Sequence, residues 1–308
     1  MNKLFTCAVL ISALFFTAAP AKAAINIFAC EPEWGSLATE IGGDAVSVYV
    51  ASTGRQDPHQ VQARPSLIAR ARNADLVFCT GAELEVGWMP VVLRQAANGK
   101  IQPGSPGYLE AASVVTMKEI PQHLDRAEGD VHAAGNPHIQ TDPRNFLPVA
   151  DALAARLAEI DPANATTYKT RHDAFITKWK AAIQKWETEA APLKGMPIAV
   201  QHKSWIYLLD WLGLKDIVAL EPKPSVPPSS GYLAEVLSKV KASPVKMTIR
   251  AGYEDERPSQ WLKQNAGVPA VELPFTVGGS DNAKDLFSLF DDTIDHLMKG
   301  VRHEYGKL

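Results

Sequence analysis

Cysteine is scarce in this sequence, and long apolar runs are absent after its first twenty residues. The chain has 308 residues and three cysteines, of which Cys7 lies inside the N-terminal apolar run. A membrane-spanning helix needs about 20 consecutive apolar residues, and no later stretch offers them. The formal net charge is −3, and no basic stripe with interleaved aromatic residues occurs. These absences argue against a membrane-embedded protein and against a nucleic-acid-binding protein.

The N-terminus has the three parts of a secretory signal peptide. A positively charged start, "MNK", is followed by the apolar run "LFTCAVLISALFFTAAP" and by the small-x-small sequence "AKA" at residues 21–23. We therefore expect residues 1–23 to be removed and the protein to be periplasmic. No cysteine stands at the cleavage site itself, so we expect no lipid anchor. Export to an oxidising compartment permits a disulfide between Cys30 and Cys79, although two buried free thiols remain the alternative.

Strand-like and helical patterns alternate along the remaining chain, whose length suggests two domains. Short apolar runs at 25–30, 46–52 and 76–80 are separated by helical patterns, which predicts parallel α/β layers. With the strand order 2-1-3 of common doubly wound sheets, Cys30 and Cys79 would lie at the same ends of neighbouring strands. A second alternation starts at 197. We predict two Rossmann-like α/β lobes, residues 24–160 and 193–308.

A long helical pattern separates the two lobes. Between Pro162 and Pro192 the chain has no glycine or proline, and its large apolar residues recur at helical spacing. These are Tyr168, Phe175, Trp179, Ile183 and Trp186. We predict a stiff bridging helix over 161–192, opened by Asp161 as N-cap and about 45 Å long. Such an aromatic stripe indicates core packing and not a cofactor site.

Three histidines lie on loops at which a ligand would be expected. His59 follows the second strand, His138 lies in "GNPHIQTDP", and His202 follows the first strand of the second lobe. Open α/β sheets bind ligands at the carboxyl ends of their strands, so all three can face the cleft between the lobes. Neutral imidazole is a good ligand for zinc. A single loop histidine is more often a surface residue, and the spacing alone is weak evidence.

Whole motifs in their order add to that evidence. "DPHQVQARPS", "GNPHIQTDP" and the strand leading to His202 surround a long helix, while "NADLVFCTGAELEVGW" and "DPANATTYKTRHDAF" stand where a known family has similar segments. The chain resembles the periplasmic zinc- and manganese-binding receptors of ABC importers. The resemblance covers nearly all of the mature chain. It implies two α/β lobes bridged by one rigid helix, with metal in the cleft between them.

Carried over residue by residue, the resemblance implies that His59, His138 and His202 bind the metal. Manganese-type members have a carboxylate where His202 stands, so the softer imidazole indicates Zn²⁺. The implied function is a zinc receptor that delivers its ion to an inner-membrane ABC permease. The resemblance also implies that the protein is a monomer and that a periplasmic metallochaperone is a further partner.

The fourth ligand departs from the family pattern. Many members have an aspartate on the loop after the last strand, where "LPFTVGGSD" places Val277. We rank Glu221 first as the fourth ligand, Asp281 second and a water third, with Asp255 as a further candidate. The polar segment 123–132, which is rich in His, Asp and Glu, is either a zinc-capturing loop or an ordinary solvated loop.

Three other functions fit part of the same pattern. A manganese receptor of the same family would use the same loops. A zinc-dependent hydrolase would also use three histidines with an open position, but it needs a general base that the sequence does not identify. A surface adhesin is a third alternative, and no adhesive repeat or anchor supports it. We therefore predict a binding protein and not an enzyme.

Overall fold

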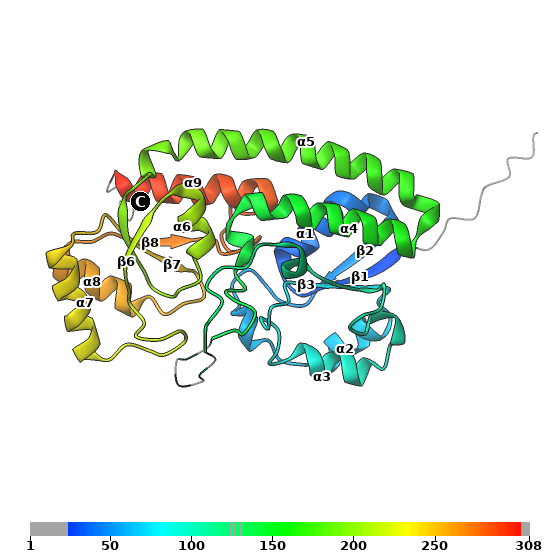
Figure 1. Ribbon diagram of the computed structural model, residues 1–308, viewed down its shortest axis with the longest axis horizontal. Coiled ribbons are helices and arrows are strands. Elements are labelled where there is room, and N and C mark those ends of the chain that lie inside the picture. Colours follow the sequence, from blue (N-terminus) through cyan, green and yellow to red (C-terminus); the bar gives the residue numbers. More distant parts are fainter. Residues whose placement is uncertain (1–23, 124, 126, 128, 130, 303–308) are drawn as a thin grey trace, which may run out of the picture.

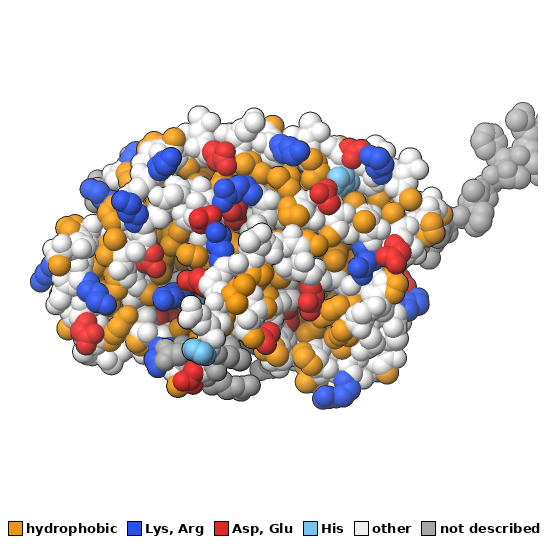
Figure 2. Space-filling model, in the orientation of Figure 1, with side chains coloured by type: hydrophobic (Ala, Val, Ile, Leu, Met, Phe, Trp, Pro, Cys, Tyr) orange, Lys and Arg blue, Asp and Glu red, His pale blue; other side chains and the backbone are white. Residues whose placement is uncertain are grey.

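The computed structural model describes residues 24–302 apart from 124, 126, 128 and 130. The predicted signal peptide, and with it the cleavage site, lies outside the described residues. Within the described residues, no helix combines the length and the apolar character needed to cross a membrane. On the face shown in Figure 2, acidic and basic side chains are interspersed, as the small net charge suggests.

Two parallel four-stranded sheets form the centres of the two lobes. The first has the order β2-β1-β3-β4 and the second the order β6-β5-β7-β8. The strands are β1 Ile25–Ala29, β2 Val46–Val50, β3 Leu76–Cys79, β4 Tyr108–Glu110, β5 Pro197–Val200, β6 Lys215–Ala219, β7 Thr248–Ala251 and β8 Ala270–Leu273. The 2-1-3 order that was assumed for the first lobe is the one observed, and each lobe has the predicted α/β class.

Helices cover these sheets and connect the lobes (Figure 1). They are α1 Pro32–Gly42, α2 Pro65–Arg72, α3 Met89–Ala96, α4 Phe146–Ile160, α5 Ala165–Glu189, α6 Ile206–Leu212, α7 Ser230–Ala242, α8 Arg257–Ala266 and α9 Leu286–Val301. Cys30 and Cys79, which follow β1 and end β3, are joined by a disulfide. The pairing was expected from the strand order, because β1 and β3 are hydrogen-bonded neighbours.

Helix α5 is the predicted bridging helix, and it runs along both lobes in Figure 1. Its regular part is shorter than the sequence suggested: 25 residues, or about 37 Å. Short 3-10 helices at Pro162–Asn164 and Ala191–Leu193 precede and follow it, each with a proline near its start. Asp161 accepts hydrogen bonds from the Asn164 amide and the Tyr168 hydroxyl and does not cap the backbone. The division of the chain at 160 and 192 stays a prediction.

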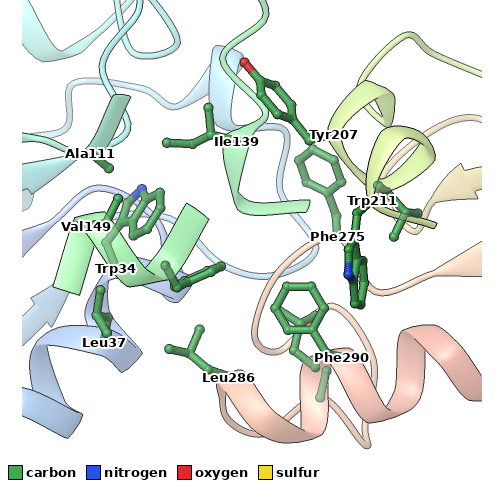
Figure 3. Packing of buried hydrophobic residues seen from close by; sticks show 14 of the residues in the cluster. Trp34, Leu37, Ala111, Ile139, Val149, Tyr207, Trp211, Phe275, Leu286 and Phe290 are labelled. Carbon is green, nitrogen blue, oxygen red and sulfur yellow. The ribbon is translucent and has the colours of Figure 1, made fainter. Parts of the chain in front are cut away.

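The stripe on α5 joins the two lobes into one core. The five predicted apolar residues are the buried residues of this helix. Trp179 contacts Phe146 of α4 on one side and Phe287 and Phe290 of α9 on the other, with ring centroids 5.0 to 5.7 Å apart. Figure 3 shows the same cluster from close by, with Trp34 of the first lobe and Phe275 of the second. One continuous hydrophobic cluster therefore underlies the cleft.

Candidate metal centre

His59 is held on a short, well-anchored loop after β2. It lies in the 3-10 helix Pro58–Gln60, which begins with Asp57 as N-cap. The Asp57 carboxylate accepts the backbone N–H of His59 at 3.0 Å and contacts the ring Nδ1 at 2.9 Å. Burial opposes charge on Asp57, but the side-chain and backbone hydrogen bonds and the charge of His59, together with the charge of His202, lower the pKa of the carboxyl below its usual value. An ionised carboxylate beside Nδ1 favours the tautomer that carries its proton on that nitrogen.

His138 is the most deeply buried of the three histidines, with 2% of its surface exposed. Its backbone N–H donates to the side chain of Asn136, whose amide also donates to the carbonyl of Lys203 in the second lobe. The ring packs edge-on against Phe275, and its Nδ1 is buried without a hydrogen-bond partner in the part of the chain that the structure describes. Burial, and then the neighbouring imidazoles, hold the pKa of His138 well below its usual value. The ring is therefore neutral, which is the form that binds a metal.

His202 directly follows β5 and is paired with a carboxylate. Its Nδ1 lies 2.7 Å from Oε2 of Glu221, which also accepts the backbone N–H of Ser225. Burial opposes charge on His202, but the hydrogen bond and the negative charge of Glu221 raise its pKa above the usual value. A carboxylate on Nδ1 leaves Nε2 as the nitrogen available to a metal.

The three loops meet between the lobes. The ring centroids of His59 and His138 are 5.2 Å apart, and those of His138 and His202 are 6.0 Å apart. Two adjoining pockets share His202 and Glu221; one includes His138, and the other includes Asp57 and His59. The donor set and the unpartnered nitrogen of His138 fit a metal ion, because a buried polar atom without a partner is costly.

The other carboxylates suggested by the sequence are placed differently. Asp281 has a fully exposed side chain, pairs with Arg55 at 3.2 Å, and lines neither of these pockets. Asp255 lies at the edge of the second pocket, and its carboxylate is bound by Arg257. Glu221 is at the site, and one of its oxygens is engaged by His202 and Ser225.

Two further residues lie at the site: His132, which the sequence placed only in the possible capturing loop, and Glu254, which the sequence did not indicate. His132 is buried and stacks on His59 with ring centroids 5.4 Å apart. It belongs to the polar segment 123–132, in which Glu128 and Asp130 lie outside the described residues, so the capturing role of that segment stays a prediction. Glu254 lines the second pocket beside Asp255, and burial raises its pKa to about 7. Its place just beyond β7, a strand of the second sheet, was the available signal.

Comparison with known proteins identifies the family to which this site belongs. A family model described as "Zinc-uptake complex component A periplasmic" matches residues 27–300. The chain belongs to this family. It is the substrate-binding component of a metal ABC transporter and not an enzyme, so the hydrolase alternative is excluded.

Relatives of the zinc-uptake component A family carry the names of several metals. The "Manganese ABC transporter substrate-binding lipoprotein scaA" of Streptococcus gordonii is 20% identical, covering 90% of this chain and 89% of its own length. The "Zinc-binding lipoprotein AdcA" of Streptococcus pneumoniae is 23% identical, covering 74% of this chain and 45% of its own length. The crystal structure of ZnuA matches at a TM-score of 0.74 and 23% identity, covering 89% of this chain and 99% of that chain. Family membership thus establishes metal binding, and the choice of metal rests on the site.

Proposed function

We propose that this protein is a periplasmic receptor that captures Zn²⁺ between its lobes and delivers it to an inner-membrane ABC permease. The main support for this proposal is that the imidazole rings of His59, His138 and His202, which come from both lobes, lie near one another. A set of three nitrogen donors suits zinc better than manganese, which prefers oxygen donors. We also propose that the protein acts as a monomer and that a periplasmic metallochaperone is a further partner.

Carboxylates on two of the three rings support this assignment. Asp57 and Glu221 each hold the Nδ1 of a proposed ligand, at 2.9 and 2.7 Å. Such partners fix the tautomer and raise the basicity of the coordinating nitrogen. Glu221 was predicted from the sequence as the fourth ligand. Its hydrogen bond to His202 gives it at least an indirect effect on the metal, because it orients the coordinating ring.

The test is a competition titration of the metal-free protein, with the wild type beside His202→Ala. We expect one tightly bound zinc per chain in the wild type and at least a roughly hundredfold weaker affinity in the variant, because it loses a ligand and leaves Glu221 without its partner. His172→Ala is the matched control, since His172 lies on α5 and pairs with Asp151 away from the cleft. Equal zinc affinity in wild type and His202→Ala would refute the proposal. Tighter binding of Mn²⁺ than of Zn²⁺ would instead support a manganese receptor.

A further inference from the structure

Glu254 lines the same pocket as His59 and His202 and is anchored by one of its two carboxylate oxygens. The residue follows β7 in the turn 252–255, and its Oε2 accepts the backbone N–H of Ala251 at 2.9 Å. Its Oε1 is inaccessible to solvent and has no hydrogen-bond partner among the described residues. One oxygen thus anchors the carboxylate to the end of the strand, and the other is left for a ligand that the protein itself does not supply.

The turn that carries Glu254 packs against Phe275, the residue that His138 also contacts. The ring centroids of Tyr253 and Phe275 are 5.4 Å apart, and those of Phe275 and His138 are 5.3 Å apart. This arrangement fixes the turn relative to the proposed metal ligands. A rigid support of this kind is what a metal site requires of each donor.

The charges around Glu254 favour a cation. The carboxylate lines the pocket that holds His59 and His202. The guanidinium of the nearby Arg250 is bound to the carboxylate of Glu272 at 2.6 Å and donates to the backbone carbonyl of Glu254. A buried carboxylate oxygen with no donor is costly, and a bound metal ion would satisfy it.

We propose that Glu254 supplies the oxygen ligand that completes the metal site with His59, His138 and His202, while Glu221 serves to orient His202. This inference rests on the proposed function. Three imidazoles and one carboxylate give the closed four-coordinate set that zinc adopts when it is held and not used for catalysis. The carboxylate of Glu221 would then keep its hydrogen bonds to His202 and Ser225 in the loaded protein.

The experiment uses Co²⁺ as a spectroscopic probe of the ligands, together with zinc competition. We compare the wild type with Glu254→Gln, Glu221→Gln and, as a matched buried-carboxyl control, Glu33→Gln. We expect Glu254→Gln to alter the visible Co²⁺ bands and to weaken zinc binding by more than about tenfold. Glu221→Gln should weaken zinc binding but leave the band positions near those of the wild type, because it changes no ligand. Glu33→Gln should change neither quantity.

The possible results test the role of Glu254 separately from the proposed function. Wild-type bands and affinity in Glu254→Gln, with binding lost in His202→Ala, would overturn the role of Glu254 alone. Altered bands in Glu221→Gln with wild-type bands in Glu254→Gln would make Glu221 the ligand. The circular dichroism melting curve of each metal-free variant checks its folding. If Glu254→Gln does not fold, Glu254→Asp retains the charge on a shorter side chain and should still alter the bands.

Discussion

Three glutamates, Glu31, Glu33 and Glu85, are buried, which is unusual for carboxylate side chains. Glu31 and Glu85 both accept the backbone N–H of Thr80. Glu33, on α1, accepts the hydroxyl of Thr276 on the loop after β8 and thereby links the two lobes. Burial raises the pKa of Glu33 to about 7. At neutral pH this contact between the lobes therefore carries a carboxyl that is close to half protonated.

Glu33→Gln is expected to stabilise the protein at alkaline pH. The folded state holds the Glu33 proton more tightly than the unfolded chain, so the stabilisation is complete below about pH 4.5 and is lost as the pH rises through 7. The amide carries no charge at any pH. Above pH 8 the variant should gain stability on the order of 3 kcal/mol, with little gain at pH 5. Urea unfolding at both pH values measures this difference, and an equal effect at the two would contradict the assignment.

A residue of the site could be predicted only where the local sequence determines the place of its side chain. His59, His138 and His202 were predicted to face the cleft because strand ends mark ligand positions in α/β sheets and because whole motifs resembled a known family; their rings do lie near one another, and their binding of a metal stays a prediction. Glu254 was missed in favour of Asp255, its neighbour, because no periodicity sets the direction of a side chain in a turn. The buried glutamates were missed because carboxylates are normally surface residues, and their burial depends on packing between distant segments.

At the scale of the element, α5 shows how much local periodicity can predict. Its buried stripe was predicted residue by residue, because a helical period places those side chains on one face whatever they pack against. The ends of the helix were less accurate, since Pro162 and Pro192 lie within short 3-10 helices that flank it. The partners of the stripe, on α4 and α9, could not be read from the helix itself.

Truncation of this stripe should destabilise the whole protein. Trp179 is fully buried between α4 and α9. Trp179→Ala is expected to lower the free energy of unfolding by about 3–5 kcal/mol through lost burial and a cavity. The neighbouring Lys180→Ala, on the exposed face, should change it by less than about 0.5 kcal/mol. Urea denaturation followed by tryptophan fluorescence and circular dichroism makes the comparison, and equal losses in the two variants would contradict a core role for Trp179.

At the scale of the molecule, the continuous core limits how far the lobes can separate. The cluster runs from β1 of the first lobe to α9 of the second, and α5 packs against α1, α4 and α9. Wide hinge closure would have to break this packing, whereas reordering of loops at the cleft would not. Metal binding should therefore act locally.

Small-angle X-ray scattering of the metal-free and zinc-loaded protein tests that limit. We expect the radius of gyration to be unchanged within the error of the measurement. Hydrogen exchange should in turn slow in the loops that carry His59, His138 and His202, because the bound ion restrains them. A clear contraction of the whole particle on loading would show that the lobes move as rigid bodies.

The shared core also has a consequence for biosynthesis. Phe287 and Phe290, which cover Trp179 from the second lobe, lie on α9 near the end of the described chain. Until that helix is made, the nascent first half exposes one side of its aromatic stripe and cannot bury it. We therefore expect that neither half folds by itself, and that a chain ending before residue 286 lacks the residues that cover Trp179 from the second lobe. Expression of either half alone should yield aggregates, whereas co-expressed halves have the surfaces with which to find each other.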